Sequence, residues 1–163
     1  MTEGQTMYVK VAQHAVGGAP DTLVTLGLGS CVAILLHDAQ ARVGGLAHVL
    51  LPEPALSRDQ GNHYKFAATA VPAMVQDLTA RGARAARLEA RLVGGAAMFS
   101  TLMVPGTLNM GERNVRAARE ALRRAGIPIR AEAVGGDYGR SVRFAVGPGR
   151  TVVTSVGRDD VLL

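Results

Sequence analysis

The chain has a single cysteine, Cys31, and no tryptophan among its 163 residues. One thiol cannot form an internal disulfide, so a hydrophobic core of mainly aliphatic side chains must hold the fold together. No apolar run approaches the roughly 18 residues of a membrane-spanning helix. The segment Met1–Thr6 lacks the basic start and apolar block of a signal peptide. We therefore expect a cytoplasmic protein that is not embedded in a membrane.

Lysine is almost absent, with only Lys10 and Lys65, so the net charge of +5 comes from arginine. A nucleic-acid binder usually gathers its positive charge on one face and offers aromatic side chains for stacking. Here the densest groups, residues 81–91 and 113–124, are predicted to lie on helix ends and solvent faces. The charge pattern predicts no nucleic-acid partner, although positive potential could steer acidic partners.

The length fits one domain, residues 1–163. Strand-like segments come early and late, with helical segments between them. The strands are predicted at Met7–Val11, Thr22–Gly27, Cys31–Leu36, Val43–Leu51, Arg87–Leu92, Ile127–Val134, Ser141–Val146 and Thr151–Val156. This order is not the regular alternation of a doubly wound fold. It predicts an α+β fold, a layered α/β sandwich with mixed sheets and two main outer helices.

The two helices are read from apolar spacing and end signals. The first runs from about Tyr64 to Arg81, and Pro72 is expected to kink or restart it. The second is predicted at Gly111–Arg124, with Asn109 as its N-cap. The segment 94–107 reads as a loop with at most a short helix.

Cys31 follows a turn containing Gly27 and Gly29. Glycine lets backbone N–H groups approach a ligand, so those of Ser30 and Cys31 are candidate donors to an oxyanion. A single free cysteine is also common as a small buried apolar residue. Cys31 alone therefore does not distinguish a catalytic nucleophile from a buried core residue.

His48 is the candidate base for Cys31. A hairpin turning around Ala39-Gln40 places the two residues opposite each other, with Cβ atoms ~5 Å apart. The imidazole could then take the thiol proton and hold a thiolate–imidazolium pair. A slip of one residue would put His48 on the other face. His37, about 20 Å along the same strand as Cys31, is too far away.

Thr25, at the end of the preceding strand, is the candidate third member, and its hydroxyl could orient the imidazole or bind a substrate amide. It reads equally well as an ordinary strand residue. Four dispersed histidines and one cysteine do not make a metal site, so we expect neither metal nor cofactor. The glycine pairs at 94–95 and 135–136 read as turns, not phosphate-binding loops.

Several blocks, in order, resemble the CheD family, the chemoreceptor glutamine deamidases of bacterial and archaeal chemotaxis. They are Thr25-Leu-Gly-Leu-Gly-Ser-Cys31, Gly44-Gly45-Leu-Ala-His48, Arg87-Leu-Glu-Ala-Arg91, Gly94-Gly95-Ala-Ala-Met98, Gly111-Glu-Arg-Asn114, Gly126-Ile-Pro128 and Gly135-Gly136-Asp-Tyr-Gly-Arg140. The resemblance runs from about Thr22 to Thr154. Asn109-Met110 departs from the isoleucine-type residue expected there, and the loop 53–62 is not diagnostic.

The resemblance implies that Cys31, His48 and Thr25 are catalytic. The implied reaction is hydrolysis of glutamine side chains in chemoreceptor helices to glutamate, with some members also removing methyl esters. It implies papain-like chemistry, a layered α/β sandwich like that of the cytotoxic necrotizing factor toxins, and a CheC-type phosphatase as a partner of some members. The first twenty residues carry little resemblance and receive no role.

Two other classes of function fit the same residues. One is a regulatory module that binds CheC or receptors with little catalysis. The other is a cysteine peptidase or transamidase that uses the same Cys31–His48 pair on other acceptors.

Overall fold

The computed structural model describes residues 3–98 and 109–163. Its strands are β1 (Thr6–Tyr8), β2 (His14–Gly18), β3 (Thr22–Leu28), β4 (Val32–Asp38), β5 (Val43–Val49), β6 (Glu89–Gly94), β7 (Ile129–Val134), β8 (Arg140–Ala145), β9 (Arg150–Ser155) and β10 (Arg158–Leu162). Its α-helices are α1 (Ala67–Ala80) and α2 (Met110–Arg124), and short 3₁₀ turns occupy Pro54–Leu56, His63–Lys65 and Ala85–Arg87. Most of the predicted loop 94–107 lies outside the described residues.

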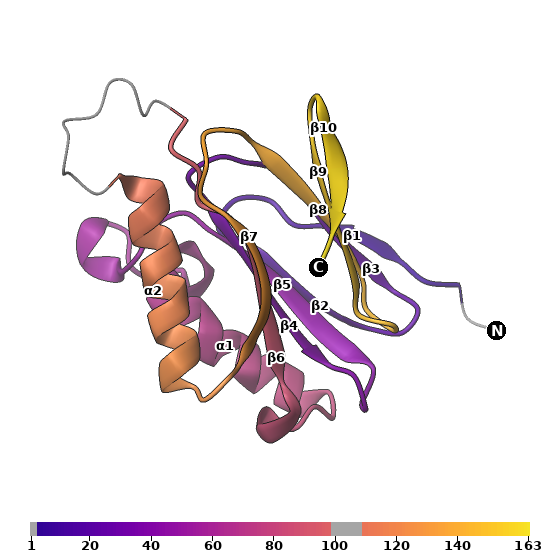
Figure 1. The fold of residues 1–163 in the computed structure, drawn as a ribbon. Helices are drawn as coiled ribbons and strands as arrows, with labels where there is room; N and C mark the ends of the chain where they lie inside the picture. The colour runs from indigo at the N-terminus through magenta and orange to yellow at the C-terminus, as the bar shows by residue number, and fades with distance from the viewer. Residues whose placement is uncertain (1–2, 99–108) are drawn as a thin grey trace.

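The strands form two five-stranded sheets that face each other. One has the order β1-β3-β8-β9-β10 and the other β2-β5-β4-β6-β7. Each contains one parallel pair, β1 with β3 and β6 with β7, so both sheets are mixed. Figure 1 shows α1 and α2 together on the outer side of the sheet that contains β4 and β5. The predicted α+β sandwich with two outer helices is confirmed.

Strand β4 is buried on both faces, which explains its unbroken apolar sequence. Val32, Ile34 and Leu36 pack with the helices in one hydrophobic cluster. Ala33 and Leu35 point the other way, into the cluster between the sheets. This alternation follows from the two-residue period of a strand.

The cluster between the sheets also contains Cys31, just before β4, and Leu46 of β5. His48 is two residues beyond Leu46 on the same strand and therefore faces the same layer. The fold thus directs both predicted chemical groups into the space between the sheets.

Some expected boundaries are wrong. The first helix begins at Ala67, because Tyr64 lies in the preceding 3₁₀ turn, and Pro72 lies inside the helix without ending it. Strands β2 and β10 were not predicted. β2 contains a glycine pair and β10 is exposed along its whole length, so neither has the apolar alternation of a half-buried strand.

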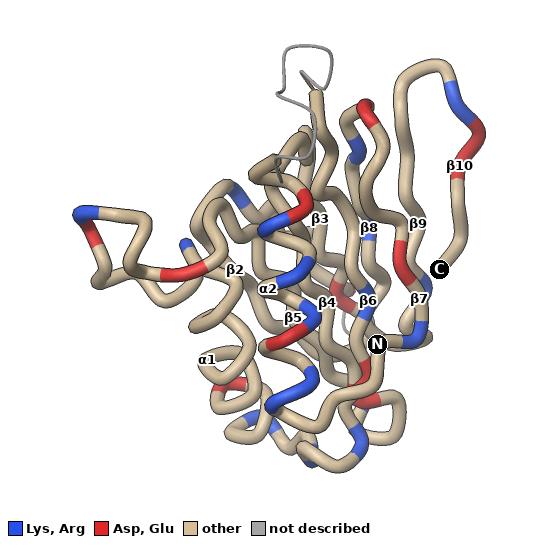
Figure 2. Tube along the Cα trace, turned by 60° about the vertical axis from the view of Figure 1, so that its left-hand side comes forward, with Lys and Arg blue, Asp and Glu red and all other residues tan. Residues whose placement is uncertain are grey.

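Charged residues are distributed over several elements (Figure 2), and the row of arginines on α2 is interleaved with glutamates. Arg123 and Arg124 both pair with Glu120. Arg87 ends the short 3₁₀ turn Ala85–Arg87, where it pairs with the buried Asp38. Arg91 lies on β6, as the predicted strand implied, between Leu35 of β4 and Ala131 of the edge strand β7. Among the described residues, no helix is long and apolar enough to span a membrane.

Candidate active site

The β4–β5 hairpin brings Cys31 and His48 onto one face, in a register different from the predicted one. His48 pairs with Ala33, and Val32 pairs with Val49. The loop after Asp38 is longer than the predicted turn, so Cys31 and His48 are diagonal neighbours rather than direct partners. The shift is two residues, which preserves the face that each side chain occupies. Diagonal Cβ atoms on one face are typically a little under 7–8 Å apart.

Thr25 reaches His48 from the opposite sheet. Its Oγ1 lies 2.7 Å from Nδ1 of His48 and 2.6 Å from the carbonyl oxygen of Val9. A carbonyl can only accept, so the single hydroxyl proton of Thr25 goes to Val9. The proton in the Thr25–His48 hydrogen bond must therefore be on Nδ1. This assigns the neutral His48 ring to the tautomer that leaves Nε2 without a proton.

Nε2 of His48 is buried and has no hydrogen-bond partner. A bare ring nitrogen in this state is a proton acceptor, as a general base requires. No hydrogen bond joins it to Sγ of Cys31 within the described part of the chain, so proton transfer requires the thiol to turn towards the ring. Catalytic hydrogen bonds are often long before substrate binds.

Burial shifts the pKa values of both groups in the direction that favours their neutral forms. Burial raises the pKa of the Cys31 thiol, against a smaller opposing effect of its own backbone. Burial also lowers the pKa of His48, and the neighbouring Val9 carbonyl only partly offsets this. Both shifts oppose the resting thiolate–imidazolium pair expected from the sequence.

The Gly29–Ser30 and Cys31–Val32 peptide groups are held in fixed directions. The carbonyl of Gly29 accepts a hydrogen bond from the N–H of Ala96 at 2.9 Å, and that of Cys31 accepts from Gly95 at 2.8 Å. In a trans peptide the next N–H points opposite to the carbonyl. The N–H of Ser30 is thereby directed away from Ala96, as a candidate oxyanion donor must be.

Gly94 and Gly95 allow the chain that follows β6 to lie close to the backbone of Cys31 and to α2. A Cβ on Gly94 would lie 2.3 Å from the Cys31 oxygen, and Gly94 has a φ of +108°. A Cβ on Gly95 would lie 2.3 Å from Cγ2 of Val115 on α2. The Gly94-Gly95 block therefore serves packing around residues 29–31, the proposed nucleophile turn, and Gly94 is the last residue of β6 rather than part of the predicted turn.

Residues 9–13, which had no predicted role, hold the site from the side of β2. Besides the Val9 carbonyl, the N–H of Ala12 donates to the carbonyl of His48, and the N–H of His48 donates to Gln13. These contacts use backbone atoms, so no side-chain pattern in the sequence could have revealed them.

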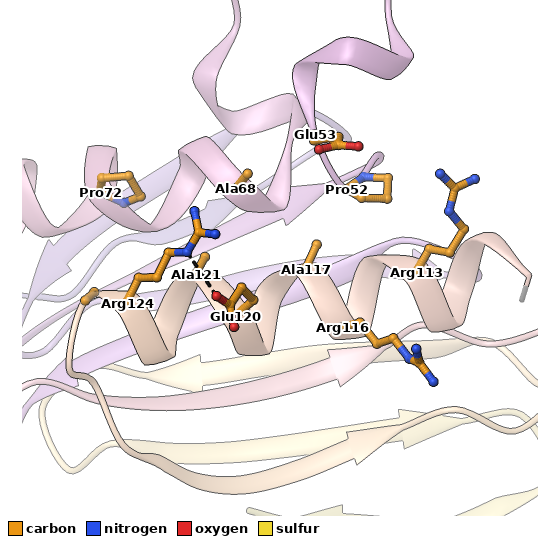
Figure 3. A pocket seen from close by; sticks show the side chains of 11 residues that line it. Pro52, Glu53, Ala68, Pro72, Arg113, Arg116, Ala117, Glu120, Ala121 and Arg124 are labelled. Atoms are coloured by element: carbon orange, nitrogen blue, oxygen red, sulfur yellow. Dashed lines mark hydrogen bonds and ion pairs between the residues drawn. The ribbon is translucent and has the colours of Figure 1, made fainter.

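Two hollows lie near these elements. A hollow of about 240 Å³ is lined by Ser30, Ala96, Met98 and the start of α2, next to the cysteine. A larger groove of about 620 Å³ runs between α1 and α2 (Figure 3) and is lined by Pro72, Ala117 and Arg113 among others. None of Thr25, Cys31 and His48 lines either hollow, and of the two only the smaller one includes a residue adjacent to them in sequence, Ser30. No cluster of three or more potential metal ligands occurs in residues 3–98 and 109–163.

Comparison with known proteins gives a consistent result. The family model described as CheD chemotactic sensory transduction matches residues 50–155. A Geobacter metallireducens protein named probable chemoreceptor glutamine deamidase CheD 2 is 47% identical, covering 91% of this chain and 92% of its own. The Thermotoga maritima chemoreceptor glutamine deamidase CheD is 40% identical, covering 94% of each chain.

A solved structure supports the fold alone. Neisseria meningitidis protein NMB0706 superposes with a TM-score of 0.50 at 12% identity, covering 83% of this chain and 64% of its own. The family-model match begins two residues after His48, so it does not bear on Thr25, Cys31 or His48. The match and the full-length relatives together show that the chain belongs to the CheD family.

Proposed function

We propose that this protein is a cysteine-dependent deamidase that converts glutamine side chains of chemoreceptor cytoplasmic helices to glutamate. The names of its relatives support the substrate class. The observation that supports the mechanism is the Thr25–His48 hydrogen bond, which leaves an unpartnered Nε2 on the face occupied by Cys31. The uncharged site suits a neutral amide as substrate.

The proposed first half-reaction forms a thioester. Nε2 of His48 takes the proton from Sγ of Cys31 as the sulfur attacks Cδ of the glutamine. The N–H groups of Ser30 and Cys31 donate hydrogen bonds to the resulting oxyanion. The tetrahedral intermediate collapses, the C–N bond breaks, and Nε2–H gives its proton to the departing ammonia.

The second half-reaction regenerates the thiol. His48 takes a proton from water as the water oxygen attacks the thioester carbon. Collapse breaks the C–S bond and releases the carboxylic acid, which ionises to glutamate by losing its proton to solvent, and the sulfur regains a proton from His48. A methyl ester could enter the same sequence with methanol as the leaving group, so we include receptor methylesterase activity in the proposal. No step requires a metal or organic cofactor.

The test uses receptor cytoplasmic fragments and mass spectrometry to follow conversion of glutamine to glutamate. Wild-type protein should convert specific glutamines, and Cys31→Ala should abolish conversion. His48→Gln should reduce the rate ~10²–10⁴-fold, the usual contribution of a general base. The exposed His63 provides a matched control, and His63→Gln should retain activity. Absence of conversion by wild type would refute the deamidase proposal, and conversion by Cys31→Ala would exclude Cys31 as nucleophile.

The same reagents test the regulatory alternative. Cys31→Ala should retain binding to a CheC-type phosphatase in a pull-down, because the substitution removes only one sulfur. A protein that binds this partner but never converts glutamine would be the regulatory module instead. Trapping a substrate acyl group on a peptide amine would indicate a transamidase.

A further inference from the structure

Asn114 is a fully buried amide in the interior of helix α2. Its Nδ2 lies 2.9 Å from the carbonyl oxygen of Ser30 and 2.9 Å from that of Leu50. Both partners are acceptors, so the NH₂ end of the amide must face them and both of its hydrogens are used. Oδ1 has no partner.

The two carbonyls belong to the two segments that carry the proposed catalytic groups. Ser30 precedes Cys31, and Leu50 follows His48 by two residues. The β4–β5 ladder ends at the pair Val32–Val49, and the N–H of Leu50 turns away to the carbonyl of Lys65. Asn114 therefore joins the two segments at the first position that the ladder leaves unpaired.

The hydrogen bond to Ser30 also sets the direction of the next N–H. Because the peptide is planar and trans, holding the Ser30 carbonyl towards α2 turns the N–H of Cys31 to the opposite side. That N–H is one of the two proposed oxyanion donors. The Gly29 and Cys31 carbonyls are held by Ala96 and Gly95, so Asn114 supplies the middle anchor of three consecutive peptides.

The placement of Asn114 is itself tightly determined. A Cβ on Gly111 would lie 2.5 Å from the carbonyl oxygens of both Gly95 and Ala96. The first turn of α2 therefore packs directly on the segment that holds the nucleophile turn. Asparagine is a weaker helix former than alanine, and here it also leaves one acceptor unsatisfied. Helix stability does not explain this residue, whereas its two donated bonds do.

We propose that Asn114 is a positioning residue that aims the Cys31 N–H at the oxyanion and fixes the spacing between the Cys31 and His48 segments. This role rests on the proposed function. It predicts that loss of the amide affects the acyl-transfer step more than substrate binding. A simple displacement at sulfur, which forms no oxyanion, should be affected much less.

The test compares Asn114→Ala with Ala118→Gly, a buried substitution one turn along α2 that weakens the helix without touching the two carbonyls. Asn114→Ala should lower kcat for deamidation about 10- to 100-fold, less than complete removal of an oxyanion donor, with KM changed less than about threefold. Alkylation of Cys31 by iodoacetamide should stay within about threefold of wild type. Ala118→Gly should retain kcat at a comparable loss of Tm.

A second measurement does not depend on catalysis. Hydrogen–deuterium exchange at residues 29–31 should accelerate at least tenfold in Asn114→Ala and not in Ala118→Gly. If wild type lacks deamidase activity but this difference appears, the proposed function and the oxyanion part of the role both fail, and only the fixing of residues 29–31 by Asn114 stands. Unchanged exchange, or equal losses of kcat in the two variants, would overturn the positioning role. Should Asn114→Ala fail to fold, Asn114→Ser, which keeps one donor, must show the same split between kcat and alkylation or the proposal is wrong.

Discussion

The hydroxyl of Thr25 and the imidazole of His48 are joined by a 2.7 Å hydrogen bond that crosses from one sheet to the other. Neither side chain is accessible to water to any appreciable extent. The position of the imidazole therefore depends on how the two sheets pack, and not only on the hairpin that carries it.

Removing the Thr25 hydroxyl should disable the imidazole. Thr25→Val keeps the shape but leaves the Val9 carbonyl and the His48 Nδ1–H without a partner, which should destabilise the fold by ~1–3 kcal/mol. The ring is then free to adopt the other tautomer, so deamidation should slow about 10- to 100-fold. Thr25→Ser restores the hydroxyl and should recover most of both losses. Equal activity of the valine and serine variants would contradict this role.

The pH dependence of deamidation should show an acidic limb below the usual histidine range. His48 must be unprotonated to act as base, and burial lowers its pKa from about 6.5. Activity should therefore persist as the pH falls through 6.5 and decline only at lower pH. A plot of kcat/KM against pH checks this, because it reports the pKa of the free protein, and a half-maximal point above 6.5 would show that the ring is not desolvated as described.

Cys31 should react slowly with alkylating reagents at neutral pH. Burial raises the pKa of its thiol, so only a small fraction is thiolate near pH 7. The iodoacetamide rate should keep rising through pH 9, and His48→Gln should change it little in the absence of substrate. A rate that reaches a plateau near neutral pH would restore the thiolate–imidazolium pair expected from the sequence.

Gly94 and Gly82 form a matched pair of glycines with positive φ. Both have φ above +100°, but a Cβ on Gly82 meets nothing within 4 Å, whereas one on Gly94 meets the Cys31 carbonyl. Gly82→Ala should cost only the backbone strain, ~1–3 kcal/mol. Gly94→Ala should cost more and should also displace the nucleophile turn and abolish deamidation. Thermal unfolding and the receptor assay separate the two effects, and identical behaviour of the variants would refute the contact.

Stability should fall on mild acidification. Burial lowers the pKa of His37 as well as that of His48. Above about pH 6.5 both rings are neutral in the folded and unfolded chains and contribute no pH dependence. Below it the unfolded chain takes up protons that the folded one resists, so the free energy of unfolding decreases until the lowered pKa values are passed. Urea titrations should show this decrease, with a smaller slope for His48→Gln. If the free energy of unfolding fell equally steeply with pH in wild type and in His48→Gln, the contribution of His48 would be contradicted.

The sequence predicted much of the fold, because apolar periodicity is a local signal. Strand β4 and helix α2 were predicted nearly to their ends, including the Asn109 cap, whose side chain accepts from the N–H of Glu112. Strand β10 was missed because its exposed, charged sequence carries no such periodicity.

The site was predicted less completely, for reasons of geometry. Side chains alternate between the two faces of a strand, and this alternation was enough to predict that Cys31 and His48 share one face. The predicted hairpin loop was too short, so the predicted pairing of Cys31 with His48 was wrong. The link from Thr25 to Val9 joins a side chain to a backbone atom sixteen residues away, and no residue pattern encodes it. Asn114 stood in a recognisable block, but its partners became apparent only from the packing of α2.

The proposed third member beside His48 is a threonine, which carries no charge, and this affects how the proposed reaction would finish. A carboxylate there would stabilise a protonated ring between steps, whereas Thr25 can only hold Nδ1 in place. The ring should therefore give up its proton quickly, first to ammonia and later to the sulfur. The same dry surroundings that keep the thiol and imidazole neutral are unfavourable to the carboxylate that deamidation creates. In the proposed reaction, the buried and uncharged site would bind the neutral amide substrate better than the carboxylate product, and this difference would favour product release.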